Sequence, residues 1–146
     1  DSGKLLESQE DKLHGSFNNS YNPSTIMRMT KELAEKILEL CKEAHPIEVG
    51  GLLLGKRKNL EANDFVIIPG TFQYSSIYIR MDQVPIYPNL IGTFHSHPSP
   101  NSRPSGADLD LFGRLGKAHL IFAYPYDLNS VGVYESSGKP SRLELI

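Results

Sequence analysis

Two histidines and an aspartate stand at a spacing that suits a divalent metal ion. His95 and His97 are separated by one residue, and Asp108 follows eleven residues after His97. Because strand side chains alternate between two faces, both imidazoles would lie on one face of an extended strand. Two neutral imidazoles and one carboxylate supply three ligands, and zinc sites that leave a fourth position for water are the catalytic kind. The spacing therefore predicts metal-dependent hydrolysis.

Asp108 also has a purely structural explanation. The run Ser105-Gly106-Ala107-Asp108 has the form of a capping box, in which Ser105 caps a helix and Asp108 occupies its third position. The two roles are compatible, because a capped helix start would hold Asp108 rigidly toward the histidines. Asp110 is the rival carboxylate, and we expect it to point roughly 200° around the helix from Asp108, into solvent.

Length, charge and cysteine content exclude several classes of protein. The chain has 146 residues, a formal net charge of −2 and one cysteine, Cys41. One domain with a substantial core is expected. We expect no nucleic-acid partner because there is no basic patch, and no membrane partner because no apolar run approaches the ~20 residues that a span needs. A lone cysteine gives neither an internal disulfide nor a cysteine zinc cage, and with no secretory signal visible we expect a cytoplasmic protein.

The most regular helical pattern begins at Thr30, a good N-cap residue, and predicts a helix over residues 31–44. Its apolar positions recur at steps of three and four residues, and Pro46 ends the pattern. Cys41 lies on the apolar face, so we expect a buried small side chain rather than a reactive thiol. His45 falls at the helix C-terminus, where its side chain can interact favourably with the helix dipole. His119 stands apart from other potential ligands, and we expect it to be a surface or core residue.

Apolar runs predict the strands of a mixed domain. The expected strands are residues 48–55, 64–71, 77–79, 90–97, 120–124, 131–134 and 142–146. A second helix is expected over residues 105–115, with Leu109, Phe112 and Leu115 on one side. Three prolines predict a rigid loop over residues 98–104. Together these patterns indicate an α+β fold, a curved and mostly antiparallel sheet flanked by helices, over residues 25–146, preceded by a flexible tail over residues 1–24.

The ordered set of site residues resembles the JAMM (MPN-plus) zinc metalloprotease family. The resemblance rests on His95-Ser96-His97-Pro98, then Ser105 and Asp108, with Glu48 upstream beside a Gly-Gly-Leu-Leu-Leu-Gly run. It covers residues 25–146 and is closest to the compact prokaryotic members, because the long insertions of larger relatives are missing. The resemblance implies a cytidine-deaminase-like fold and one Zn²⁺ per chain.

The same resemblance implies a role for each residue. His95, His97 and Asp108 would bind the zinc ion. Glu48 would accept a proton from the attacking water and later deliver it to the leaving amine, and Ser105 would donate a hydrogen bond to the developing oxyanion. Without the resemblance, Glu48 is explained as a solvated acid after a helix and Ser105 as a helix cap alone.

For the substrate, the resemblance implies a ubiquitin-like protein cleaved at the amide or isopeptide bond after its C-terminal glycine. Trimming the C-terminus of a ubiquitin-like sulfur-carrier protein and a non-catalytic scaffold of the same fold are the alternatives. A zinc deaminase would need His-x-Glu and Pro-Cys-x-x-Cys, which are absent. We expect the substrate tail to add a strand beside the metal-bearing strand, and the tail or residues 72–90 to act as a lid. The particular modifier and the oligomeric state stay open.

Overall fold

The computed structural model describes residues 5–7, 26–68, 71–73, 76–78 and 84–146. The first helix, α2 (Lys31–Ala44), has the bounds predicted from the sequence. The hydroxyl of Thr30 accepts a hydrogen bond from the backbone N–H of Leu33 at 3.2 Å, and the N–H of His45 closes the helix on the carbonyl of Cys41. The prediction of a capped, amphipathic helix here is confirmed.

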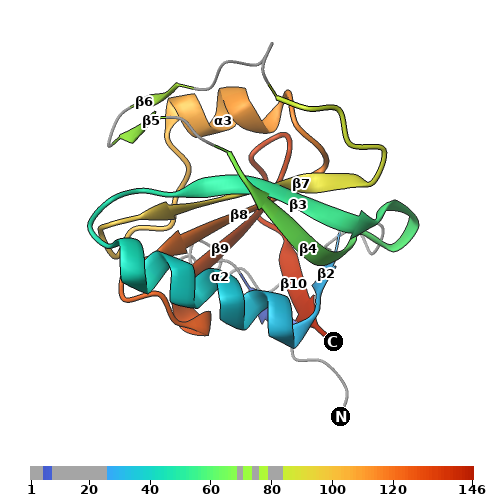
Figure 1. The fold of residues 1–146 in the computed structure, drawn as a ribbon, viewed down its shortest axis with the longest axis horizontal. Coiled ribbons are helices and arrows are strands. Elements are labelled where there is room, and N and C mark those ends of the chain that lie inside the picture. Colours follow the sequence, from blue (N-terminus) through green and yellow to red (C-terminus); the bar gives the residue numbers. More distant parts are fainter. Residues whose placement is uncertain (1–4, 8–25, 69–70, 74–75, 79–83) are drawn as a thin grey trace.

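A single large sheet forms the centre of the molecule (Figure 1). Its strands are β1 (Leu5–Glu7), β2 (Met27–Met29), β3 (Gly50–Lys56), β4 (Glu61–Ile67), β7 (Leu90–His97), β8 (Ala118–Ala123), β9 (Val131–Glu135) and β10 (Arg142–Leu145). They lie in the order β1-β10-β2-β4-β3-β7-β8-β9. The pairs β10–β2, β2–β4 and β7–β8 are parallel, and the others are antiparallel. The predicted α+β class is confirmed.

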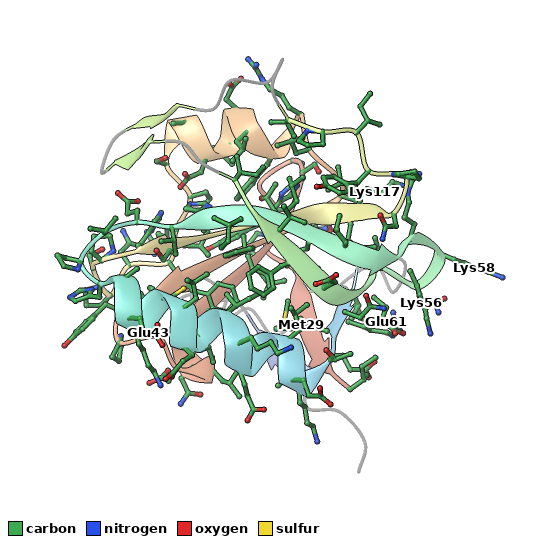
Figure 2. All side chains as sticks on the ribbon, viewed as in Figure 1. Met29, Glu43, Lys56, Lys58, Glu61 and Lys117 are labelled. Atoms are coloured by element: carbon green, nitrogen blue, oxygen red, sulfur yellow. The ribbon has the colours of Figure 1, made fainter. Side chains whose placement is uncertain are left out.

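Helices cover both faces of this sheet, with α2 on one face and α3 (Gly106–Phe112) on the other (Figure 1). Leu53 and Phe94 belong to the cluster packed under α2. Met29, labelled in Figure 2, is fully buried in the same cluster. Leu52 instead packs with Leu111 of α3 on the opposite face. This alternation along β3 is the period-two pattern of a strand buried on both faces.

Two features near the chain ends were not predicted. β2 is only three residues long, and its central Arg28 interrupts the apolar pattern, so its sequence has no clear strand signature. Leu5–Glu7 forms β1 beside β10, within the segment predicted as a tail. The rest of residues 1–24 lies outside the described residues, so the boundary between tail and domain stays a prediction.

The segment expected to act as a lid is only partly described. β5 (Thr71–Gln73) and β6 (Ser76–Tyr78) pair as a separate antiparallel two-stranded sheet, and β6 contacts α3. Residues 74–75 and 79–83 lie outside the described residues, and the lid role stays a prediction. Neither of the two α-helices in the described part of the chain is long and apolar enough to cross a membrane.

The second helix is shorter than predicted and packs with a different phase. α3 ends at Phe112 rather than near Leu115. Leu109 is 41% exposed, so the prediction that it shares one side with Phe112 and Leu115, which are buried, is wrong, and Leu111 is buried instead. The helix turns Asp108, Leu111 and Phe112 inward together, which is the spacing of one helical face. The inward position of Asp108 thus determines which leucine is buried.

Candidate metal centre

The strand β7 places its two histidines on the face of the sheet that α3 covers. His95 and His97 alternate with Phe94, which packs under α2, and with Ser96, whose hydroxyl interacts with the Cys41 thiol of α2. His95 is fully buried, and its ring lies 6.4 Å from the ring of Phe112 in α3. The predicted placement of both imidazoles on one strand face is therefore seen in the structure.

A capping box at the start of α3 holds the aspartate. The Ser105 hydroxyl oxygen accepts from the backbone N–H of Asp108 at 3.1 Å, and Asp108 Oδ2 accepts from the backbone N–H of Ser105 at 2.8 Å. These two bonds fix both the helix start and the carboxylate orientation. Asp110 points away and forms an exposed ion pair with Arg114 at 3.1 Å, as expected for the rival carboxylate.

The three candidate ligands converge on one point. His95 Nε2 lies 3.2 Å from His97 Nε2 and 3.0 Å from Asp108 Oδ1. His97 Nε2 lies 3.3 Å from Asp108 Oδ2. Ligands bound to tetrahedral zinc at 2.0–2.1 Å are separated by about 3.3 Å. The spacing of these donors therefore fits a zinc ion bound by three side chains.

A backbone carbonyl sets the tautomer of His97. Its Nδ1–H donates to the carbonyl of Asn101 at 2.8 Å, which leaves Nε2 of the neutral ring with its lone pair toward the other two donors. A hydrogen bond of this kind orients metal-binding histidines in many proteins. Asn101 was not singled out in the sequence, because no motif marks a carbonyl group.

At two of the three donors, Asp108 and His95, the pKa shifts favour the protonation state that binds a metal. Burial raises the pKa of the Asp108 carboxyl, but the contacts of its oxygens with the imidazoles of His95 and His97 outweigh it and hold that pKa well below its usual range. Burial is the main effect at His95 and lowers its pKa. At His97 burial also lowers the pKa, but the contacts with Asp108 and Asn101 more than offset it and the net shift is upward. An ionised carboxylate beside a neutral, buried imidazole is what a cation needs.

Glu48 lies at the rim of the same site, in the segment that joins α2 to β3. The next residue, Val49, is tied to β7 twice: its N–H donates to the Ser96 hydroxyl at 3.0 Å, and its carbonyl accepts from the Ser96 N–H at 2.9 Å. Burial is the chief cause that raises the pKa of the Glu48 carboxyl, while nearby His97 lowers it and Asp108 raises it further. A carboxylate with a raised pKa is a better proton acceptor.

A pocket of about 400 Å³ opens beside the ligands. Glu48, His97 and Ser105 line it together, as do Asn101 and Arg103 of the loop over residues 98–104. The structure thus brings all five predicted site residues to one place. Arg103 was missed, because a single arginine in a proline-rich loop carries no recognisable signal.

The other singled-out residues are structural. Cys41 is fully buried, and burial raises its pKa to about 12. His45 caps α2 and its Nδ1 lies 2.7 Å from the hydroxyl of Tyr126. His119 is fully buried and its ring stacks on Phe112 at 4.2 Å.

The expectation that a substrate strand adds beside the metal-bearing strand is wrong. β7 is hydrogen-bonded to β3 on one side and to β8 on the other, and the β8 pairing runs through both histidines. A strand paired on both sides offers no free edge to an extended peptide. An extended peptide bound at this site could not pair with β7 as an added strand.

Comparisons with known proteins agree with this geometry. A family model for prokaryotic homologues of the JAB domain matches residues 30–134, a range that includes every residue of the site. A probable metalloprotease of Haloferax volcanii is 38% identical over 131 residues, covering 83% of this chain and 80% of the relative.

Two solved structures are similar over nearly their whole length. A JAB1/MPN domain protein from Archaeoglobus fulgidus has a TM-score of 0.65 and 37% identity, covering 82% of this chain and 99% of the other. A second structure, described as "JAMM: A Metalloprotease-like Zinc Site in the Proteasome and Signalosome", has a TM-score of 0.62 and 37% identity, covering 84% of this chain and 99% of the other.

Proposed function

This chain belongs to the family of prokaryotic homologues of the JAB domain, and from that premise we propose that it is a zinc-dependent peptidase. The observation that carries the proposal is the convergence of His95, His97 and Asp108, whose ligand atoms all lie within 4.8 Å of one another. The names of two relatives, a probable metalloprotease and a metalloprotease-like zinc site, support the same reaction class.

Zinc held by these side chains would lower the pKa of a bound water to about 7, so that hydroxide is available at neutral pH. Glu48, held at the pocket rim, accepts the proton of the attacking water. The water oxygen bonds to the carbonyl carbon, the carbon–nitrogen bond breaks, and Glu48 returns the proton to the amine that leaves. Burial raises the pKa of the Glu48 carboxyl, and a carboxylate with a raised pKa is a better acceptor for the proton of the water.

Ser105 has a hydroxyl proton to offer the substrate. Its oxygen accepts the N–H of Asp108, and among the described residues its O–H has no acceptor, so it is available to donate toward the pocket that Ser105 lines. A donor aimed at the oxygen that gains charge in the transition state stabilises that state, and removing such a donor costs about 3–4 kcal/mol in a comparable site. We assign this role to Ser105.

The proposed substrate is a ubiquitin-like protein whose C-terminal glycine is joined to a lysine or to a further residue. An extended glycine tail has no side chains to exclude, so it can cross a shallow pocket close to the ligands. Trimming the C-terminus of a ubiquitin-like sulfur carrier is the alternative substrate for the same chemistry. A non-catalytic scaffold is disfavoured, because all three ligands, Glu48 and Ser105 lie together.

Metal content and cleavage, measured together, test the proposal. The substrate is a ubiquitin-like protein joined through its C-terminal glycine to a reporter, and Glu48→Gln is compared with the wild type. We expect one zinc per chain in both proteins and a fall in kcat of about 10²–10⁴-fold in the variant, the usual contribution of a general base.

Glu43→Gln is the matched control. Glu43 is an exposed acid of α2, the helix on the face of the sheet opposite α3, and its variant is expected to keep full activity (Figures 1 and 2). Absence of bound zinc in the wild type would overturn the proposal. Full activity in Glu48→Gln would remove Glu48 from the mechanism and leave the zinc site standing.

A further inference from the structure

Arg103 is an exposed cation in the wall of the pocket that also contains Glu48 and Ser105. Two other arginines of the described chain lie beside carboxylates: Arg28 lies 3.0 Å from Glu144, and Arg114 lies 3.1 Å from Asp110. The exposed Arg57 instead donates to the carbonyl of Pro88 at 3.3 Å. Among the residues that the structure describes, no carboxylate lies within ion-pair distance of the Arg103 guanidinium. The pocket wall therefore holds a positive charge that no carboxylate of the described residues neutralises.

The loop over residues 98–104 fixes the backbone from which this side chain extends. The carbonyl of Ser99 accepts from the N–H of Tyr124 at 3.1 Å. The buried Ser102 carbonyl accepts from the hydroxyl of Tyr134 at 2.7 Å. The N–H of Arg103 itself donates to the side chain of Asn101 at 2.9 Å.

These bonds tie the loop to β8 and β9, and Ser105 caps α3 directly after it. Because the loop is anchored at both ends, the backbone that carries the Arg103 side chain is held in place beside the ligands. Less freedom is then lost when the guanidinium binds an anion than if it came from an unanchored loop.

The chemistry of the proposed substrate limits what Arg103 can meet. The glycine tail on the acyl side carries no charge, and a lysine joined through its side chain presents only neutral amides near the bond that breaks. A carboxylate lies close to that bond only when the leaving group is a C-terminal residue, through its α-carboxylate, or has an acidic side chain. A guanidinium forms two parallel hydrogen bonds with a carboxylate, the geometry for which arginine is best suited.

We propose that Arg103 binds a carboxylate of the leaving group, so that the site prefers a short C-terminal extension after glycine over an isopeptide-linked lysine. This inference rests on the proposed peptidase function and identifies its substrate class. The pocket of about 400 Å³ has room for an extension of this kind.

Paired substrates test the inference. One ubiquitin-like protein is prepared with an alanine after its C-terminal glycine, either as the free acid or as the amide. A second pair carries glutamate amide or glutamine amide at the same position, and a third form carries an isopeptide-linked lysine. We expect the zinc-loaded wild type to cleave the free acid with a kcat/KM about 10- to 100-fold above that of its amide, the range for losing a hydrogen bond to a charged group.

Arg103→Ala should remove this preference by raising KM for the acid, with the amide rate changed less than about twofold, and Arg103→Lys should keep part of it. Arg114→Ala, at an exposed arginine two residues after the end of α3, is the matched control and should behave as wild type. Preference for the glutamate over the glutamine amide identifies a side-chain carboxylate as the ligand. Preference for the free acid alone identifies the α-carboxylate.

A binding measurement separates this inference from the proposed function. Calorimetric titration of Glu48→Gln with the acid and the amide should show tighter binding of the acid by about tenfold or more, lost when Arg103→Ala is added. Equal affinity for the acid and the amide, together with equal affinity for the glutamate and glutamine amides, would overturn the inference, whether or not the wild type cleaves any of them. Equal cleavage rates within both pairs would overturn it while leaving the peptidase intact. Failure to cleave any substrate would count against the peptidase alone, and the titration would still decide the role of Arg103.

Discussion

At the scale of single residues, Ser105 joins the stability of the fold to its chemistry. Its oxygen caps α3 by accepting from the N–H of Asp108, and its own N–H holds Oδ2 of the same aspartate. The proposed function adds a third role, donation of the hydroxyl proton to the substrate. Removing the hydroxyl eliminates helix capping and donation to the substrate, which both use the side chain. The bond to Asp108 Oδ2 remains, because it uses the backbone N–H.

Ser105→Ala and Ser105→Gly together separate capping from catalysis. Loss of an N-cap hydroxyl to alanine costs about 0.5–2 kcal/mol, whereas glycine at the cap costs only a few tenths. We expect the alanine variant to unfold at lower denaturant concentration, while the glycine variant stays close to wild type. Both should lose about 10²–10³-fold in kcat, because both lack the donor to the oxyanion.

Urea unfolding and steady-state kinetics on the same preparations provide the two readouts. If activity instead follows stability, so that the glycine variant keeps its rate, then Ser105 is a cap and nothing more.

At the scale of elements, the parts of the site that could be predicted are those built by local rules. The alternation of side chains along β7 places His95 and His97 on one face, and the capping box places Asp108. A few neighbouring residues were therefore sufficient to predict the position of each ligand. Contacts between distant elements could not be found in this way. The bond from Tyr134 to the Ser102 carbonyl spans 32 residues, and it positions the loop that carries Arg103.

The same reasoning explains the elements that were missed or misjudged. α2 carries its own cap and a full apolar face, and its bounds were predicted in full. β2 is a strand only because β10 and β4 pair with it on either side. The pairing of β7 on both sides leaves no free edge for a substrate. It depends on the order of the strands in the sheet, which the sequence of β7 alone does not reveal.

A buried polar network ties β7 to β8 and to the segment that follows β9. His119 Nδ1 lies 2.9 Å from the Thr93 hydroxyl, and its Nε2 lies 2.9 Å from the Ser136 hydroxyl. Because Ser136 donates to the carbonyl of Gly116, it accepts from Nε2–H, and the ring is neutral. Burial is the chief cause that lowers the pKa of His119 to about 3.

This network predicts a loss of stability in acid. The unfolded chain binds a proton at His119 near its ordinary pKa of 6.5, whereas the folded chain does so only near 3. The unfolded state therefore holds more protons in this window, and the free energy of unfolding should fall as pH decreases from about 6.5 to about 3. His119→Gln should be less stable at neutral pH but should lose less stability across that window.

Chemical denaturation of the metal-free proteins at several pH values gives the slope of the free energy of unfolding against pH for the wild type and for His119→Gln. Parallel pH profiles for wild type and His119→Gln would show that His119 does not carry this effect.

At the scale of the whole molecule, the sheet separates a stabilising face from a reactive one. The large apolar cluster lies between the sheet and α2, and it includes Met29 and Leu53. The candidate ligands lie on the other face, where β7 and α3 meet. Because the main core does not include the ligands, folding should not require the metal. A bound ion should nevertheless add stability by joining β7 to α3.

Metal removal should therefore lower stability without unfolding the protein. A ligand present at 100 times its dissociation constant stabilises the folded state by about 2.7 kcal/mol, which corresponds to roughly 5–10 °C in Tm for a chain of this size. We expect chelation to lower Tm by that amount, added zinc to restore it, and the far-ultraviolet circular dichroism to stay unchanged.

Asp108→Asn should abolish the response to zinc, because one of the three ligands loses its charge and with it most of its affinity for the cation. Asp110→Asn, an exposed acid two residues further along the same helix, should respond as wild type does. A zinc response that survives in Asp108→Asn would place the metal elsewhere. Collapse of the fold on chelation would show that the ion organises the core as well as the site, against the separation of the two faces.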